Sequence, residues 1–327
     1  MRVEPKPSAE TIVEVQNLTK RFGSFTAVAG ISFAVRRGEI FGFLGPNGAG
    51  KSTTIRMLCG LLAPSSGSGR VAGFDIVRDT EKIKTRIGYM SQKFSLYDEL
   101  TAEENIDFYS GIYCLPKAKK AERKAWVLKM AGLEAHRTSR TSELSGGWKQ
   151  RLALGCAVLH EPPILFLDEP TSGVDPISRR QFWDLIYSLS GQGVTVFVTT
   201  HYMEESEDCD RLGIIYRGEL IALGTPRELK TKHMPEAVLE VDCAQPNEAM
   251  STLQKLSEIK EVALFGNGLH AVAADPVKAD AAIRAALASG GFKLDRLERI
   301  TPTLEDVFVS LIEARDRAEG AQQEFRR

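Results

Sequence analysis

Eight residues from Gly45 to Ser52, with the sequence GPNGAGKS, constrain the fold of this chain more strongly than any other segment. They fit the pattern G-x-x-x-x-G-K-[ST]. A short apolar run at Ile40–Leu44 precedes them, and apolar residues recur at helical spacing over Thr53–Leu62. A strand, a glycine-rich loop and a helix in this order are the context that the pattern requires. The segment therefore predicts a phosphate-binding loop at the end of a strand.

The residue types in this loop suit phosphate binding. Glycines let the backbone wrap closely around phosphate oxygens, so that successive N–H groups and the positive end of the following helix point at the anion. Lys51 adds a positive charge near the β- and γ-phosphates, and the Ser52 hydroxyl is a ligand for magnesium. These residues predict a nucleotide site, but they leave kinases, GTPases and many motor ATPases open.

Two further motifs narrow the choice. Ile164–Leu167 is an apolar strand that ends in two acids, which places Asp168 near the metal and Glu169 where it polarises an attacking water. Upstream of this strand, Ser145–Gly147 opens a helical run and offers free N–H groups to an anion. A Ser-Gly-Gly segment at a helix start is more often an ordinary cap, so its meaning depends on the other two motifs.

Taken together, these motifs resemble the ATP-binding cassette (ABC) family, and the resemblance extends over about Ile12–Leu229. It implies that Phe22 stacks on adenine, that Gln92 contacts the metal and the attacking water, and that His201 contacts the γ-phosphate. It also implies that the loop Ser172–Asp175 crosses a dimer interface.

The resemblance assigns ATP and Mg²⁺ to this chain as cofactors. Catalytic roles fall to Glu169, His201 and Gln92. Metal ligation falls to Ser52, Gln92 and Asp168. The residues expected to contact the nucleotide are Phe22, Gly45, Asn47, Gly48, Ala49, Gly50, Lys51, Ser52, Thr53, Ser145, Gly146, Gly147 and Asp175.

The sequence departs from the family pattern at two positions. Phe22 stands where the family often has tyrosine, which keeps the stacking face and loses only the hydroxyl. Trp148 replaces the glutamine that often follows the Ser-Gly-Gly segment. Adenine stacking is therefore expected to survive, whereas the polar contact of that glutamine has no counterpart.

In the family, ATP binds between two cassettes, with the phosphate loop of one facing the Ser-Gly-Gly segment of the other. This chain carries one set of motifs, so the resemblance implies a partner cassette, either a second copy of this chain or a related one. Loss of the γ-phosphate removes the charge that both surfaces bind, so hydrolysis is expected to open the pair.

Strands that alternate with helices predict an α/β fold built on a parallel sheet, with an antiparallel β subdomain and a helical subdomain at Ala102–Leu133. We expect this ABC ATP-binding domain over residues 11–232. The composition changes after Leu229, and residues 236–314 predict a small C-terminal ferredoxin-like α/β domain in the order βαββαβ, with a last helix from Thr303 to Ala314. The polar residues 315–327 are expected to form a disordered tail.

Two segments indicate a branch of the family. The run His201–Arg211 and the segment Thr303–Phe308 resemble the ATPase subunits of type 2 ABC exporters, and Trp148–Arg151 suggests their multidrug-efflux branch. This implies an ATPase that powers export of a substrate through a partner permease. The ATPase of an importer, or a soluble ABC ATPase outside transport, is the alternative.

Composition narrows the partners and the location. The chain has 42 Lys and Arg against 43 Asp and Glu, a net charge of −1, so we expect no nucleic-acid partner. Its five cysteines are widely spaced, which argues against a disulfide framework or a zinc site. A secretory leader and an apolar run of bilayer length are both missing from the sequence. We expect a cytoplasmic protein, held on the inner face of the plasma membrane by an integral membrane permease.

The region Gln92–Tyr113 is expected to receive a short helix from that permease. Its aromatic and apolar side chains suit such a contact, although helical spacing of apolar residues equally predicts burial in the core. The side chains concerned are Phe94, Leu96, Tyr97, Leu100, Phe108 and Tyr109.

Overall fold

The structure, a computed structural model, describes residues 10–234 and 236–324. It divides into two compact units, of which the first ends at Thr225 and the second begins at Pro226. Each unit has a hydrophobic core of its own.

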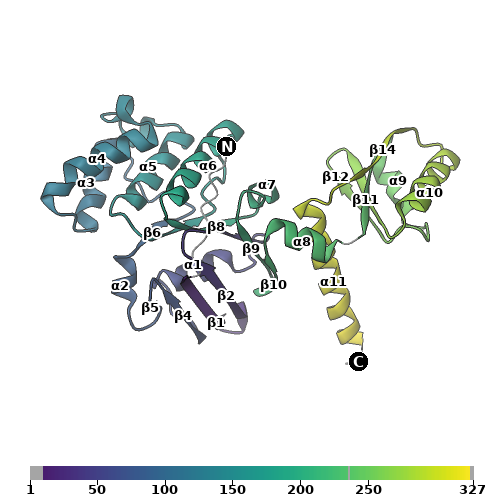
Figure 1. Cartoon of the computed structure of the whole chain (residues 1–327), viewed down its shortest axis with the longest axis horizontal. Helices are drawn as coiled ribbons and strands as arrows, with labels where there is room; N and C mark the ends of the chain where they lie inside the picture. The colour runs from purple at the N-terminus through teal and green to yellow at the C-terminus, as the bar shows by residue number, and fades with distance from the viewer. Residues whose placement is uncertain (1–9, 235, 325–327) are drawn as a thin grey trace. The chain divides into compact units, whose positions relative to one another are not determined.

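A six-stranded sheet forms the centre of the first unit, and its strands β6, β8, β9 and β10 are labelled in Figure 1. The strand order is β10-β9-β3-β8-β7-β6. Its strands are β3 (Ile40–Leu44), β6 (Ile87–Met90), β7 (Ile164–Asp168), β8 (Thr195–Thr200), β9 (Arg211–Tyr216) and β10 (Glu219–Gly224). Neighbouring strands are parallel except for the β9–β10 hairpin. Strands β3, β7 and β8 are buried along their whole length, as parallel strands covered on both faces should be.

A second sheet of four antiparallel strands has the order β2-β1-β4-β5. Its strands are β1 (Thr11–Phe22), β2 (Phe25–Arg36), β4 (Ser66–Val71) and β5 (Phe74–Asp75). Phe33 of β2 stacks on Phe41 of β3 with ring centres 5.6 Å apart, so a shared apolar core joins the two sheets. The predicted parallel core and antiparallel subdomain are both confirmed.

Seven α-helices belong to the described part of the first unit. They are α1 (Lys51–Leu58), α2 (Thr80–Lys84), α3 (Ala102–Ile112), α4 (Lys117–Ala131), α5 (Gly146–Val158), α6 (Pro176–Gly191) and α7 (Met203–Ser206). Helices α3, α4 and α5 pack together around a separate apolar cluster, away from strands β1, β2 and β4 (Figure 1). They form the predicted helical subdomain. The expected single segment Ala102–Leu133 is divided in two, because Cys114 adopts a φ of 52° and Pro116 ends the helical path.

The second unit contains a four-stranded antiparallel sheet in the order β12-β13-β11-β14. Its elements are β11 (Ala237–Cys243), α9 (Pro246–Leu253), β12 (Glu261–Phe265), β13 (Gly268–Ala273), α10 (Pro276–Ser289) and β14 (Leu294–Ile300). Helices α9 and α10 cover one face of this sheet and enclose its core. The predicted ferredoxin-like βαββαβ domain is therefore confirmed.

Two boundaries differ from the sequence prediction. Helix α8 (Pro226–His233) groups with the second unit, whereas the predicted first domain extends to residue 232. Helix α11 (Leu304–Glu324) continues through residues predicted to be a disordered tail, and its alanines, glutamates and glutamines favour that continuation. Residues 325–327 of the predicted tail lie outside the described residues. Within the described ranges, no helix combines the length and apolar character that crossing a membrane requires.

Candidate functional site

The phosphate loop, Gly45–Ser52, joins β3 to α1 along a path that two of its glycines make possible. Gly50 directly precedes α1 with a φ of 108°, and a Cβ there would lie 2.4 Å from the carbonyl oxygen of Ala27. At Gly45 a Cβ would lie 2.3 Å from the carbonyl oxygen of Ile215. Side chains are excluded at both positions, so the backbone keeps the close path that a phosphate cradle needs.

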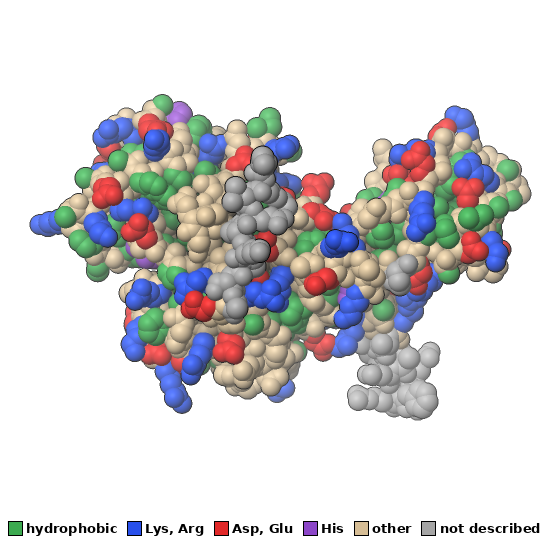
Figure 2. Space-filling model, viewed as in Figure 1, with side chains coloured by type: hydrophobic (Ala, Val, Ile, Leu, Met, Phe, Trp, Pro, Cys, Tyr) green, Lys and Arg blue, Asp and Glu red, His purple; other side chains and the backbone are tan. Residues whose placement is uncertain are grey.

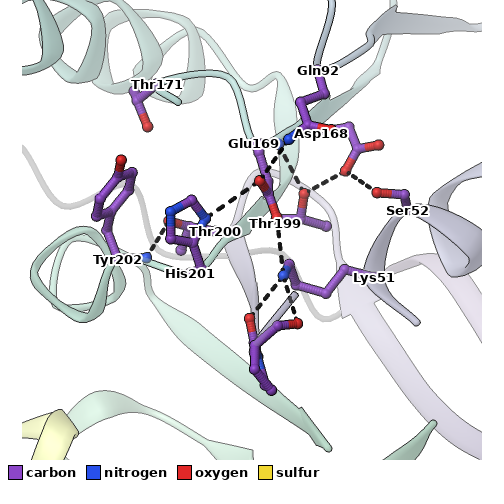
Figure 3. Close-up of polar contacts among 12 residues, drawn as sticks. Lys51, Ser52, Gln92, Asp168, Glu169, Thr171, Thr199, Thr200, His201 and Tyr202 are labelled. Carbon is purple, nitrogen blue, oxygen red and sulfur yellow. Dashed lines mark hydrogen bonds and ion pairs between the residues drawn. The ribbon is translucent and has the colours of Figure 1, made fainter. Parts of the chain in front are cut away.

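Lys51 begins α1, and its buried side chain points to three acceptors. Its Nζ donates to the carbonyl oxygens of Gly45 at 2.7 Å and Pro46 at 3.1 Å, and it lies 3.0 Å from Oε1 of Glu169 (Figure 3). A lysine ammonium has three N–H groups, so these acceptors satisfy all of them. A phosphate oxygen would have to replace at least one of these contacts.

The carboxylate of Asp168 lies at the carboxyl end of β7 and accepts hydrogen bonds from two hydroxyl groups. The Ser52 hydroxyl donates to Oδ1 at 3.0 Å, and the Thr199 hydroxyl donates to the same oxygen at 2.8 Å. Burial raises the pKa of Asp168 above its usual range, and the hydrogen bonds from Thr199 and Ser52 offset part of that rise.

Glu169 follows β7 in a left-handed backbone conformation, with a φ of 47°. Its N–H donates to the Thr199 hydroxyl at 2.9 Å. Its side chain is buried, and Oε2 accepts from Nε2 of Gln92 at 3.0 Å and lies 3.3 Å from Nδ1 of His201 (Figure 3). The carboxylate is thus held between a cation on one oxygen and an amide and an imidazole on the other.

The structure brings together six of the residues singled out from the sequence. They are Lys51, Ser52, Gln92, Asp168, Glu169 and His201. They come from four separate segments, which follow β3, β6, β7 and β8. Because these strands are parallel neighbours in one sheet, their carboxyl ends meet at one edge.

The other predicted nucleotide contacts of the phosphate loop lie around this cluster. Asn47 and Gly48 are exposed, Ala49 is buried, and Thr53 is half-buried in the first turn of α1. At the end of β1, Phe22 is 49% exposed and Nζ of Lys20 lies 5.1 Å from its ring centre. An exposed ring face at this position is compatible with the predicted adenine stacking.

The Ser-Gly-Gly segment, Ser145–Gly147, lies apart from the cluster. Ser145 immediately precedes α5, and no side chain caps the first turn of that helix. Gly147 is packed so closely that a Cβ would lie 2.5 Å from the Ser178 hydroxyl, whereas Ser145 and Gly146 are exposed. In the part of the chain that the structure describes, no hydrogen bond or ion pair joins this segment to the phosphate loop. Asp175 likewise serves another element, since it accepts from Ile177 and Ser178 at the start of α6.

Trp148 has a packing role at the position where the family often has glutamine. Its ring lies against the helical subdomain, with the Arg151 guanidinium 4.7 Å and the His136 ring 5.0 Å from its centre. Gln150, two residues further on, is fully buried and donates to the carbonyl oxygen of Pro170. That bond ties α5 to the segment that follows Glu169.

Sequence reasoning missed a third buried carboxylate near Asp168 and Glu169, that of Glu205 on α7. Its Oε1 accepts from the Thr171 hydroxyl, its Oε2 accepts from the Thr200 hydroxyl at 2.7 Å, and Nε of Arg179 lies 3.5 Å from Oε1. It therefore connects the segment after Glu169 with the residue before His201. The only sequence signal was its place in the acidic run after His201, where an exposed helix face is the ordinary expectation.

The donor set fits magnesium. The Ser52 hydroxyl and the Asp168 carboxylate are already hydrogen-bonded to each other, and both are hard oxygen ligands. Magnesium in nucleotide sites needs only one or two protein oxygens, because phosphates and water supply the rest. Among the described residues, no group of three or more His, Cys, Asp or Glu side chains is placed to hold a metal.

Comparison with known proteins gives two family matches. Residues 28–172 match the ABC transporter family, and residues 224–312 match the C-terminal domain of ATP-binding proteins like DrrA1-3. Among solved structures, the chain is similar to an ATP-binding subunit of an ABC transporter, with a TM-score of 0.62, 30% identity and coverage of 68% of this chain and 93% of that one. It is also similar to the ATP-binding cassette MJ0796 in a dimeric post-hydrolysis state with ADP and Pi, with a TM-score of 0.60, 27% identity and coverage of 65% and 98%.

Curated relatives match either the cassette or the whole chain. The probable multidrug ABC transporter ATP-binding protein YbhF of Escherichia coli is 54% identical over 70% of this chain, which spans only 40% of that protein. The linearmycin resistance ATP-binding protein LnrL of Bacillus subtilis is 38% identical over 92% of this chain and 98% of its own length. The Nod factor export ATP-binding protein I of Ralstonia nicotianae is 36% identical over 95% of this chain and 98% of its own.

Proposed function

The chain belongs to the ABC transporter ATP-binding family, and on that premise we propose that it is the ATP-hydrolysing subunit of a membrane exporter. One observation carries the catalytic part of this proposal: Lys51 and Glu169 meet beside the phosphate loop at the edge where parallel strands end. The names of the relatives, which refer to multidrug transport, linearmycin resistance and Nod factor export, support export. They do not favour an importer or an ATPase outside transport.

The residues of the cluster divide the work of hydrolysis. The loop N–H groups and Lys51 bind the β- and γ-phosphates, and Phe22 stacks on the adenine. Ser52, Asp168 and Gln92 would hold Mg²⁺, which neutralises charge on the phosphate oxygens when it is bound.

Glu169 then acts as the general base. When Lys51 turns to the phosphates, Oε1 of Glu169 loses its cation and becomes available to a water molecule. Gln92 and His201, which both contact Oε2, keep the carboxylate aimed while it accepts the proton. His201, which belongs to the same cluster, also contacts the γ-phosphate in this proposal.

A second cassette completes the site. The first turn of α5 has no side-chain cap, and Ser145 and Gly146 are exposed, so its N–H groups suit a phosphate that another protomer holds. The partner cassette is a second copy of this chain or a related one. Asp175, at the start of α6, lies in the loop that would line the same interface.

The membrane partner docks on the helical side of the first unit. Tyr97 and Phe108 are 46% and 38% exposed and lie edge to face with ring centres 4.6 Å apart. Ile112 is also exposed, and it borders a hollow that Tyr89 and Tyr113 help to line. Such a surface suits a short helix from a permease.

The expected docking residues do not all face outward. Leu96 and Tyr109 pack against the core of the helical subdomain, and Phe94 and Leu100 are half-buried. Tyr97 and Phe108 are therefore the side chains of this set that we assign to the contact. Figure 2 shows basic and acidic side chains interspersed over the visible face. Because nucleic-acid binding calls for a basic patch or stripe, we propose no nucleic-acid partner.

The second unit is proposed to be an accessory domain that regulates or pairs the ATPase. It has its own core, and none of the six clustered residues belongs to it. Its match to the DrrA-like C-terminal domain supports a role specific to this branch of the family. The whole chain would work on the cytoplasmic face of the membrane, held there by the permease.

The test of the assembly uses Glu169→Gln protein, which should bind ATP without consuming it. In size-exclusion chromatography with light scattering, this variant should be a monomer without nucleotide and a dimer with ATP. A further change of Ser145→Arg at the exposed helix start should abolish the dimer. If Glu169→Gln protein binds ATP and stays monomeric, two copies of this chain do not bind ATP between them. Detergent pull-downs that recover no membrane protein would favour an ATPase outside transport.

A further inference from the structure

We propose that Thr199 is a positioning residue that holds both acids of the site, Asp168 and Glu169, with a single hydroxyl group. This inference rests on the proposed function, because it assigns Thr199 a part in ATP hydrolysis. Thr199 does not belong to any of the motifs found in the sequence. It acts through Asp168, the last residue of β7, and Glu169, which follows that strand.

The geometry joins one side chain to two functional groups. Thr199 lies on β8 directly opposite Asp168 on β7, and its side chain is fully buried. Its hydroxyl donates to Oδ1 of Asp168 at 2.8 Å and accepts the backbone N–H of Glu169 at 2.9 Å (Figure 3). The single hydroxyl hydrogen is thus directed to the carboxylate, and the oxygen lone pair is directed to the amide.

The bond to Asp168 determines how its carboxylate is turned. Oδ1 accepts from both Thr199 and Ser52, whereas no hydrogen bond from a described residue reaches Oδ2. One carboxylate oxygen is therefore anchored and the other is left to a ligand. Without the Thr199 hydroxyl, Ser52 alone would have to fix the rotation of the carboxylate, although Ser52 is itself an expected metal ligand.

The bond to Glu169 stabilises an unusual backbone conformation. A φ of 47° is unfavourable for a residue with a side chain, and such strain persists only where surrounding contacts hold it. The Thr199 hydroxyl supplies such a contact by accepting the N–H of Glu169. This turn directs the Glu169 carboxylate towards Lys51, Gln92 and His201. Loss of the hydroxyl should therefore displace the general base as well as the metal ligand.

The chain offers a matched control on the same strand. Thr195 is the first residue of β8, is also fully buried, and accepts the backbone N–H of Gly38 at 2.9 Å. It lies at the opposite end of the strand from the site. Thr199→Val and Thr195→Val each remove one buried hydroxyl with little change of shape. Thr195→Val therefore reports what the loss of a buried hydroxyl on β8 does when it occurs away from the site.

The experiment compares the wild-type chain with Thr199→Val, Thr199→Ser and Thr195→Val proteins. Thr199→Val should lower kcat for ATP at saturating Mg²⁺ by about 10- to 100-fold and change KM by less than about twofold, because the phosphate loop is intact. Thr199→Ser keeps the hydroxyl, so its kcat should lie within about threefold of the wild-type value. The kcat of the control, Thr195→Val, should lie in the same range.

A binding measurement gives a readout that does not depend on turnover. Calorimetric titration with ADP should show that Mg²⁺ strengthens binding less in Thr199→Val than in wild type, whereas ADP binding in EDTA should be equal. If Thr199→Val does not fold, Thr199→Ala takes its place with the same expectations. Equal kcat in wild type and Thr199→Val, or equal losses in Thr199→Val and Thr195→Val, would overturn the inference alone. A wild-type chain without ATPase activity would instead overturn the proposed function and this inference together.

Discussion

Nζ of Lys51 lies 3.0 Å from Oε1 of Glu169, and both side chains are almost completely buried. The two residues are far apart in the sequence, and they meet because β3 and β7 flank β8 and run parallel to it. An ion pair removed from water in this way is costly unless other groups complete it. Gln92, His201 and two loop carbonyl groups complete it here. In this structure the ammonium group of Lys51, which we expect to bind phosphate, and the carboxylate of Glu169, the proposed general base, therefore neutralise each other.

Glu205 should stabilise the first unit through its buried contacts. Glu205→Ala leaves Arg179 without its carboxylate and leaves the hydroxyls of Thr171 and Thr200 without their acceptor, so the free energy of unfolding should fall by about 3 kcal/mol. Urea titration measures this change. Glu204→Ala, at an exposed neighbouring position, should change stability by less than about 0.5 kcal/mol. Equal effects of the two variants would show that Glu205 does not act through these contacts.

His160 should make the stability of the first unit depend on pH. Burial lowers the pKa of His160 to about 4, while its Nε2 lies 3.0 Å from the carbonyl oxygen of Ile87. The unfolded chain binds a proton at His160 near pH 6.5, whereas the folded chain does not. The contribution of His160 to the free energy of unfolding is therefore complete above pH 6.5 and is lost as the pH falls towards 4. The free energy of unfolding should decrease by on the order of 1 kcal/mol per pH unit in this window.

The control for this pH effect is His160→Gln, which cannot bind the proton. Its unfolding free energy, measured in urea between pH 7.5 and 5, should fall less steeply than that of the wild type. Parallel curves for the two proteins would assign the pH dependence to other groups.

Removal of the second unit should leave nucleotide binding in place. The division between the units lies after Thr225, so a chain that ends there retains the whole phosphate loop, strand β7 and Glu169. We expect this shortened protein to unfold cooperatively and to bind ADP within about threefold of the full chain, since no clustered residue is lost. A cooperatively folded truncation that binds no nucleotide would show that the second unit takes part in the site.

Tyr97 and Phe108 should be required for attachment to the permease and not for catalysis. A charged residue in place of either exposed ring, as in Tyr97→Glu or Phe108→Glu, should reduce co-purification of the membrane partner and keep the ATPase rate of the isolated chain within about twofold. Val277→Glu, at an exposed apolar position of the second unit, is the matched control and should retain the partner. Full recovery of the partner with Tyr97→Glu and Phe108→Glu would place the docking surface elsewhere.

Local sequence patterns predicted four residues of the cluster, and the family resemblance added Gln92 and His201, but neither predicted the contacts that hold them. Lys51, Ser52, Asp168 and Glu169 belong to motifs whose spacing and flanking elements are specific, so their place at the ends of β3 and β7 was predictable. Thr199 and Glu205 were not, because a threonine in a buried strand and a glutamate in an acidic run are ordinary in sequence. Their roles depend on partners that only the pairing of β7 with β8 and the packing of α7 bring near.

The errors at element boundaries have a similar origin. Apolar spacing continues across the end of α3, and Gly111 and Pro116 were the local signs of the break before α4. The assignment of α8 to the second unit depends on its packing against α11, which lies far along the chain. The tail was predicted to be disordered because its residues are polar, although they favour a helix once α11 has begun.

The rate of phosphate release by Glu169→Gln protein with ATP and Mg²⁺ tests whether Glu169 is the general base of an ATP-hydrolysing cassette. Glutamine keeps the shape of the side chain and the contact to Gln92 but cannot accept a proton, so the rate should fall by about 100-fold or more relative to wild type. ATP should still bind, whereas Lys51→Ala protein should bind it about 10-fold more weakly because a charge-assisted contact to phosphate is lost. Unchanged phosphate release by Glu169→Gln protein would show that Glu169 is not the general base.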